Sequence, residues 1–242
     1  MGNPVTWFEV HGPEPEQAAK FYSELFGWSM QSMPESNYTL IDTHAGSGIN
    51  GGIGQTREDQ PPQSVFYAEN PDIKALLEKA ESLGGKVVVP VTEIPDMVTF
   101  AHFTDPFGNL VGLVQGDGNT NVSAGDNPPV DWFELSCSEP EKAWDFYREL
   151  FGWAIKANPG EHFVHGSVDT GGGIHGGIGG SPDGQPHVAL YASVDDLQKN
   201  LERAESLGGK TTMPPTQVDP HTSIAMFVDP QGTSFGIYAS QD

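Results

Sequence analysis

The chain has 242 residues, of which 30 are glycine and 20 are proline, and its formal net charge is -22 at pH 7. This much glycine and proline favours short elements joined by turns and excludes a helical bundle. A phosphate backbone or an anionic membrane would repel so acidic a chain, so neither nucleic acid nor a membrane is expected as a partner. The single cysteine, Cys137, forms no internal disulfide and suits a reducing compartment, so we expect a cytoplasmic protein.

The first half of the chain predicts short strands and two helices in a fixed order. Residues 5–10 alternate as in a strand. A helix follows from Pro15, carries apolar residues at spacings of three and four, and ends at Gly27. A second helix over 72–83 is closed by two glycines. The remaining strands are predicted at 38–42, 49–53, 64–68, 87–90, 98–104 and 110–115.

The same order repeats in the second half. Residues 7–28 align with 132–153, with 14 of 22 positions identical. The signatures AESLGGK and Asp-Pro-x-Gly also recur, at an offset of 124 to 125 residues. Between the copies the chain is polar, rich in Gly, Asn and Pro, and without a hydrophobic period. We therefore predict two domains at 1–118 and 128–242, joined by a linker at 119–127.

These signatures together resemble the vicinal oxygen chelate superfamily, which contains glyoxalase I, bleomycin-resistance proteins, fosfomycin-resistance enzymes and extradiol dioxygenases. Both halves have a helix ending in FY-x-x-LFG, glycine-broken strands, a second helix ending in LGG and a closing Asp-Pro-x-Gly hairpin. The resemblance implies an α+β fold of tandem glyoxalase-like domains, each with two βαβββ modules whose sheets curve around a cup-shaped cavity. A tandem chain resembles two fused subunits of the family, so we expect a monomer or a homodimer.

Enzymes of this superfamily hold a divalent metal with His and Glu side chains on the first and last strands of the modules. By resemblance, the ligand positions fall on residues without a suitable side-chain donor: Trp7, Trp132, Val65, Ala189, Gly112 and Gly236. Zinc, iron and nickel sites need three or four N, O or S donors, so we expect neither a metal nor another cofactor. Five of the eight histidines lie in the second half: His162, His165, His175, His187 and His221. His187 lies two residues before a ligand position, so a shift in register would restore one donor.

A glutamate recurs on the first strand of each half in a Trp-x-Glu pattern. Side chains alternate along a strand, so Glu9 and His11 are expected on the same face as Trp7, toward the cavity. Glu134 and Trp132 repeat the pair. A carboxylate near a Trp wall can have a raised pKa and act as a general acid or base, which makes Glu9 and Glu134 the catalytic candidates. The alternative is structural, with both glutamates holding the first strands across the interface between modules.

Aromatic and histidine side chains make up the predicted ligand-binding set. Alternation and the family register turn the aromatic rings inward, and planar substrates stack well on such walls. The alternative is that the rings fill a cup that holds no metal. The candidate ligand-binding residues are Trp7, His11, Tyr67, Trp132, His187, Tyr191 and Tyr238.

Two glycine-rich segments, 46–51 and 171–176, match the pattern G-x-G-x-x-G. This pattern binds a dinucleotide only between a strand and the start of a helix, whereas both segments here run into strand-like and loop sequence. We therefore reject a dinucleotide site and expect the glycines to let the strands bend.

Three hypotheses for function follow. The missing donors favour a small-molecule-binding protein of the bleomycin-resistance kind, without the family metal site, that sequesters or carries an organic ligand in an aromatic-lined cavity. The second hypothesis is a metal-independent isomerase, lyase or cyclase acting on a natural product with Glu9 or Glu134 as acid or base. The third is a metal-dependent glyoxalase, hydroxylase or dioxygenase. Whether the protein is an enzyme stays open, and a small organic molecule is the expected partner in each case.

Overall fold

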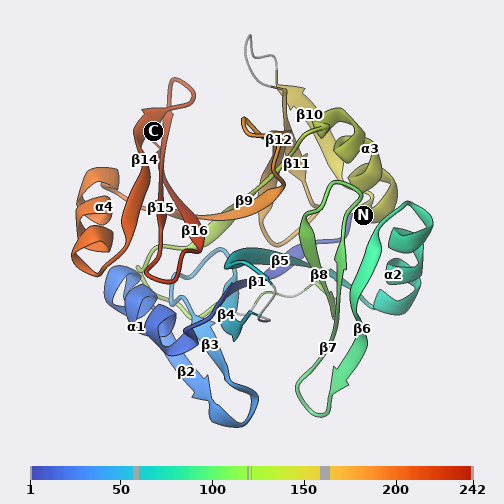
Figure 1. The fold of residues 1–242 in the computed structure, drawn as a ribbon, viewed down its shortest axis with the longest axis horizontal. Helices are drawn as coiled ribbons and strands as arrows, with labels where there is room; N and C mark the ends of the chain where they lie inside the picture. Colours follow the sequence, from blue (N-terminus) through green and yellow to red (C-terminus); the bar gives the residue numbers. More distant parts are fainter. Residues whose placement is uncertain (1, 57–59, 119, 121, 159–163, 241–242) are drawn as a thin grey trace. The chain divides into compact units, whose positions relative to one another are not determined.

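The computed structural model describes residues 2–56, 60–118, 120, 122–158 and 164–240. Both halves consist of two βαβββ modules (Figure 1), so the predicted α+β class is confirmed. The first half contains β1 (Val5–Gly12), α1 (Pro15–Phe26), β2 (Ser29–Met33), β3 (Tyr38–Asp42), β4 (Asn50–Gln55), β5 (Gln63–Asn70), α2 (Ile73–Ser82), β6 (Lys86–Ile94), β7 (Val98–Thr104) and β8 (Leu110–Gln115). The second half contains β9 (Val130–Cys137), α3 (Pro140–Phe151), β10 (Ala154–Asn158), β11 (His165–Asp169), β12 (His175–Gly180), β13 (His187–Ser193), α4 (Leu197–Ser206), β14 (Lys210–Gln217), β15 (Thr222–Val228) and β16 (Ser234–Ser240).

The strands form two mixed sheets of eight strands. Their orders are β2-β3-β4-β1-β5-β8-β7-β6 and β10-β11-β12-β9-β13-β16-β15-β14. Strands β5 and β8 pair in parallel with Tyr67 opposite Gly112, and β13 and β16 pair in the same way with Tyr191 opposite Gly236. The prediction from sequence misses β2, an edge strand without a buried residue, because its residues show no apolar alternation.

The chain folds into two compact units, and each unit combines modules from different halves. Unit 1 comprises Met1–Trp7, Val65–Thr120 and Trp132–Val188, and unit 2 comprises Phe8–Ser64, Asn121–Asp131 and Ala189–Asp242. Helix α2 packs beside α3 in unit 1, and α1 packs beside α4 in unit 2 (Figure 1). The second module of the first half therefore shares a core with the first module of the second half, and the other two modules share the other core.

Aromatic rings fill the core of each unit. In unit 2, Tyr22 of α1 stacks on Trp28 with ring centres 5.9 Å apart, and Phe235 of β16 packs against both. In unit 1, Tyr147 of α3 stacks on Trp153 with ring centres 5.4 Å apart. Burial of such large rings supplies much of the apolar stabilisation of each unit.

Two of the repeated motifs, FY-x-x-LFG and Asp-Pro-x-Gly, are in contact inside each core. The tyrosine of FY-x-x-LFG donates a hydrogen bond to the aspartate of Asp-Pro-x-Gly, from Tyr147 to Asp105 at 2.8 Å in unit 1 and from Tyr22 to Asp229 at 3.3 Å in unit 2. Burial, and then the neighbouring aspartate, raises the pKa of both tyrosines well above the usual value. Both phenols therefore stay protonated and can donate, which links the two modules of each unit.

Two glycines of the G-x-G-x-x-G segments allow a strand to approach closely. Gly48 and Gly173 have positive φ angles of 73° and 66°. A Cβ on Gly48 would lie 2.4 Å from the carbonyl oxygen of Val130, and one on Gly173 would lie 1.9 Å from that of Val5. Each carbonyl accepts a hydrogen bond from the residue that follows the glycine. The glycines thus make room for the start of β1 and β9, a reason beyond the bending expected from sequence, and both segments lead into strands rather than helices.

Residues 122–129, which lead from the first half to the second, belong to unit 2. Asn127 donates to the carbonyl oxygens of Gly27 and Thr43, both at 3.0 Å. The indole of Trp28 donates to the carbonyl oxygen of Pro128 at 2.9 Å. These bonds tie the end of α1 to the segment that leads into β9. Positions 119 and 121 of the predicted linker lie outside the described residues, as do the chain ends at 1 and 241–242.

The helices have the end signals that the sequence predicts. Pro15 begins α1, and Gly27 follows its end in the left-handed conformation, with φ 77°. Asp72 caps α2, since its side chain accepts from the backbone N–H of Ala75 at 3.0 Å. Within the described part of the chain, no helix combines the length and the apolar character needed to cross a membrane.

Candidate functional site

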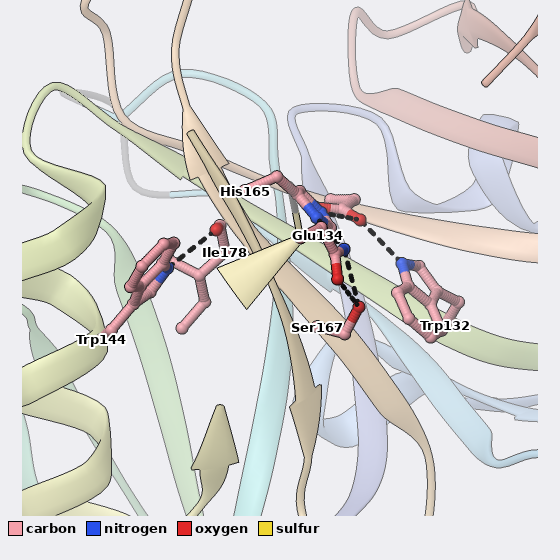
Figure 2. Close-up of polar contacts among 7 residues, drawn as sticks. Trp132, Glu134, Trp144, His165, Ser167 and Ile178 are labelled. Carbon is pink, nitrogen blue, oxygen red and sulfur yellow. Dashed lines mark hydrogen bonds and ion pairs between the residues drawn. The ribbon is translucent and has the colours of Figure 1, made fainter. Parts of the chain in front are cut away.

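Glu134 of β9 lies at the centre of a polar cluster in unit 1 (Figure 2). The indole N–H of Trp132 donates to Glu134 Oε1 at 2.8 Å, and His165 Nε2 of β11 lies 3.2 Å from both carboxylate oxygens. Gly177 of β12 makes room for this pair, since a Cβ there would lie 2.3 Å from Glu134 Oε1 and 2.4 Å from His165 Nε2. The His165 and Glu134 side chains are 31% and 23% exposed, so a ligand in solvent can reach both.

The other ring nitrogen of His165 faces an amide. Asn158 Nδ2 lies 2.9 Å from His165 Nδ1 and donates to Ser167 Oγ at 2.8 Å. With Nε2–H donating to Glu134, Nδ1 accepts from the Asn158 amide. The hydrogen bond to Glu134 raises the pKa of His165, against desolvation, which lowers it. Glu134 thus favours the imidazolium that forms when Nδ1 takes up a proton.

An open depression of about 510 Å³ adjoins this cluster on the same strands. Trp132 forms an aromatic wall, and Lys156 and Ser167 bring polar groups from β10 and β11. His175 and Asp169 lie at its rim, with His175 Nδ1 3.5 Å from Asp169 Oδ1. Trp132 and Ser167 belong both to the depression and to the hydrogen-bonded cluster, so the two form one site.

Strand β12 is held from the helix side by Trp144 of α3. The buried indole donates to the carbonyl oxygen of Ile178 at 3.0 Å. Figure 2 shows Trp144 on the helix, away from the cluster of Glu134 and His165. Because Ile178 follows Gly177, this bond fixes the part of β12 that lies against the Glu134–His165 pair.

Glu9, the equivalent glutamate of the first half, lies in unit 2 and has other partners. Tyr38 donates to Glu9 Oε1 at 2.6 Å, and His11 Nε2 lies 2.5 Å from Glu9 Oε2. The side chains of Glu9 and His11 are each 12% exposed, less than their counterparts around Glu134. The structure therefore brings together the predicted pair of Glu9 and His11 and adds Tyr38.

Strand register shows which positions correspond between the two clusters. Tyr38 lies opposite Met33 across β2 and β3, as His165 lies opposite Asn158 across β10 and β11. Tyr38 therefore occupies the place of His165. In turn, the position of His11 on β1 is taken on β9 by Ser136. Each glutamate keeps a histidine partner, but the two histidines come from different strands.

Trp7 and Tyr67 lie in a mainly apolar cluster of unit 1. Tyr67 is buried, its hydroxyl lies 2.6 Å from Nε2 of buried His102, and Trp7 packs against the cluster around it. A Cβ on Gly112, which faces Tyr67 across β5 and β8, would lie 2.4 Å from Tyr67 Cδ1. The Tyr67 ring therefore occupies the space that a longer side chain at position 112 would need.

The other predicted binding residues are Tyr191, Tyr238 and His187. The buried ring of Tyr191 covers Gly236, where a Cβ would lie 2.2 Å from Tyr191 Cε1. Tyr238 donates to Asp131 at 2.9 Å, and burial raises the pKa of Asp131 to about 6 and that of Tyr238 to about 12. His187 is exposed at the start of β13.

The positions that the resemblance assigns to metal ligands do not fit a metal. They hold Trp, Val, Ala and Gly, and in both halves a tyrosine ring lies against the glycine. These residues supply none of the donors that a transition metal needs. Among the residues that the structure describes, no three His, Cys, Asp or Glu side chains are grouped to hold an ion. His162 falls in the segment 159–163, outside the described residues.

From the sequence, His165 is predicted only as one of the histidines of the second half, and Tyr38, Asn158 and Ser167 are not predicted as site residues. Alignment of the two halves could have indicated His165, but only if the alignment is shifted by two or three residues in this segment. His165 corresponds to Tyr38 at an offset of 127 (165 minus 38), whereas the flanking signatures align at 124 to 125.

A model of the Glyoxalase/Bleomycin resistance protein/Dioxygenase superfamily matches residues 5–113 and 130–237. The chain belongs to this superfamily and carries two copies of its domain in tandem, which confirms the resemblance seen in the sequence.

Individual relatives span nearly the whole chain. CFP32 of Mycobacterium tuberculosis (strain CDC 1551 / Oshkosh), whose name assigns it provisionally to the glyoxylases, is 26% identical over 250 residues, covering 98% of this chain and 94% of CFP32. The anthracycline biosynthesis protein DauV of Streptomyces sp. (strain C5) is 26% identical over 260 residues, covering 96% of this chain and 91% of DauV. The Mn(II)-bound glyoxalase from Novosphingobium aromaticivorans shares the fold, with a TM-score of 0.74 at 15% identity over 100% of this chain and 83% of that chain.

Proposed function

We propose that the protein binds a planar aromatic molecule with oxygen substituents in the depression beside Trp132. The observation that carries the proposal is the depression of about 510 Å³, which combines an indole wall with the Lys156 side chain. An aromatic ligand stacks on an indole, and a carbonyl, phenolate or carboxylate oxygen pairs with an ammonium group.

The lysine of the site supports a ligand rich in oxygen. The chain has only 11 Lys and Arg against 33 Asp and Glu, so a lysine at a depression stands out from its surroundings. His175 lies at the rim, where its Nδ1 is 3.5 Å from the carboxylate of Asp169. At the equivalent positions of the first half lie Gln31 and Asn50, which carry no charge. The preference for an anionic or polarised oxygen therefore belongs to the second half.

The name of one relative is consistent with this ligand class. DauV is named for anthracycline biosynthesis, and anthracyclines contain a planar anthraquinone with phenol and quinone oxygens. A metal-dependent glyoxalase, hydroxylase or dioxygenase would need donors at positions where this chain has Trp, Val, Ala and Gly. Sequestering or carrying a planar aromatic molecule is the function that the described residues support best.

The test is a fluorescence titration with 1,4-dihydroxyanthraquinone, a fused aromatic with phenol and quinone oxygens. We expect saturable binding to the wild type and a dissociation constant at least about tenfold higher for Trp132→Leu, because the stacking wall is lost. Lys156→Gln is expected to weaken binding about threefold and to reduce its sensitivity to salt. Lys142→Gln, an exposed position on α3, is the matched control and should bind as the wild type does. Equal affinity of the wild type and Trp132→Leu would contradict the proposal.

A further inference from the structure

The two ring nitrogens of His165 have different hydrogen-bond partners. Nε2 points at Glu134, which also accepts from the indole of Trp132 and is thereby fixed in place. Nδ1 faces Asn158, whose side chain also bonds Ser167 at the depression. Asn158 is exposed, so its amide can yield its place to a ligand, whereas Glu134 is fixed by the strand that carries it.

We propose that His165 is a general base, which removes a proton from a ligand bound beside Trp132, and that Glu134 positions its ring. The inference rests on the proposed binding function and extends it to proton transfer. The substrate class is a planar aromatic ketone with an acidic C–H beside the carbonyl group.

The step balances within the site. The C–H bond of the ligand breaks, its proton forms an N–H bond at His165 Nδ1, and the electron pair of the C–H bond passes to the carbonyl oxygen as an enolate. Glu134 stabilises the imidazolium through Nε2–H. Lys156 is one of the residues that line the depression, and its ammonium group stabilises the enolate oxygen. Nδ1 exchanges its proton with solvent, and return of a proton from Nδ1 to the same carbon completes the exchange and regenerates the base.

Among the residues that face His165, Glu134 is the charged group with the strongest effect on it. Glu134 raises the pKa of His165 through a hydrogen bond and its charge. On β12 the facing residues are Gly177 and Gly179, which have no ionisable side chain. On β10, Asn158 is neutral, and Lys156 lies two residues before it. A pH profile of proton exchange therefore reports on the His165–Glu134 pair.

The experiment follows deuterium uptake by 2-tetralone, an aromatic ketone with an acidic CH₂ group, in D₂O by NMR, alongside a fluorescence titration with the same probe. We expect the wild type to accelerate exchange, with a rate that rises as His165 loses its proton, and His165→Gln to lose at least about 100-fold of that acceleration. Glu134→Gln should retain binding, lower the rate, and move the midpoint of the pH profile to lower pH, since a neutral amide no longer favours the imidazolium. The matched control is His221→Gln in the exposed turn before β15, which should exchange as the wild type does.

Each outcome bears on a separate claim, with the fold of every variant checked by circular dichroism. Binding by the wild type with equal exchange in the wild type and His165→Gln would overturn the general base and leave the binding function intact. An unchanged pH midpoint in Glu134→Gln would overturn the positioning role of Glu134. Absence of saturable binding by the wild type would overturn both the binding function and the base that rests on it.

Discussion

Glu9 and Glu134 are equivalent residues of the two halves, but the residues around them differ. Glu9 accepts from Tyr38 and lies 2.5 Å from His11 in a cluster with little exposure. Glu134 shares a more exposed cluster with His165, beside a depression that has a lysine. The duplicated residue on its own therefore indicates neither catalysis nor structure, because the strands around it decide which role its geometry suits. We interpret the cluster of Glu9 as structural and the cluster of Glu134 as functional.

The largest expected effect is a difference in the free energy of unfolding between variants of the two glutamates. Glu9→Ala removes the acceptor that Tyr38 and His11 share in a nearly closed cluster, so we expect a loss of about 2–3 kcal/mol in the free energy of unfolding. Glu134→Ala should cost about 1 kcal/mol or less, since solvent replaces the lost contacts. Urea unfolding of both variants measures the difference, and similar losses would break the distinction between the clusters.

A smaller effect tests a buried carboxylate at the start of β9. Burial raises the pKa of Asp131 to about 6, and Tyr238 donates to one of its oxygens. A raised carboxyl pKa gives stability that is fully present below the unfolded pKa and is lost as pH rises through the folded pKa. Above pH 6 the buried charge is therefore a cost, and Asp131→Asn should be more stable than the wild type by about 1–2 kcal/mol at neutral pH.

The advantage of Asp131→Asn should shrink toward pH 4, where the wild-type carboxyl is protonated. Thermal unfolding at several pH values measures it. The equivalent position of the first half holds Thr6, whose hydroxyl donates to Glu69 at 2.6 Å. Thr6→Val serves as the comparison, and it should lose stability without this dependence on pH. A wild type more stable than Asp131→Asn above pH 6 would contradict the expected sign.

The smallest expected effect concerns His165. Its pKa is raised in the folded state, so the stability from its interaction with Glu134 is fully present below the unfolded pKa and is lost as pH rises through the folded pKa. The wild type should therefore lose more stability than His165→Gln as pH rises from about 6 to about 8. The difference should stay below about 1 kcal/mol, because the pair is partly exposed. Parallel stability curves for the two proteins would show that Glu134 does not favour the imidazolium.

Much of the fold could be predicted from local patterns. Strands predicted at 98–104 and 110–115 match β7 and β8. The pairing of modules could not be predicted. Phe21 of α1 packs on Phe227 of β15 in unit 2, but the repeat offers similar apolar faces in both halves, so the sequence favours neither partner.

The candidate site was predictable only in part. The Trp-x-Glu pattern identified Trp132 and Glu134, because alternation along one strand places them on one face. Their partner His165 lies on another strand, and its position depends on the register of β11 against β10 and β12. The resemblance to the superfamily assigns a ligand position to Gly112, but the Tyr67 ring that covers this glycine depends on pairing between β5 and β8. Such contacts across strands carry no local signal in the sequence.

The most direct test of the central claim is a crystal structure of the protein with 1,4-dihydroxyanthraquinone at saturating concentration. The claim predicts the ligand rings stacked on the indole of Trp132, with an oxygen within hydrogen-bonding distance of Lys156. Ligand density elsewhere in the molecule, with the depression beside Trp132 empty, would contradict it.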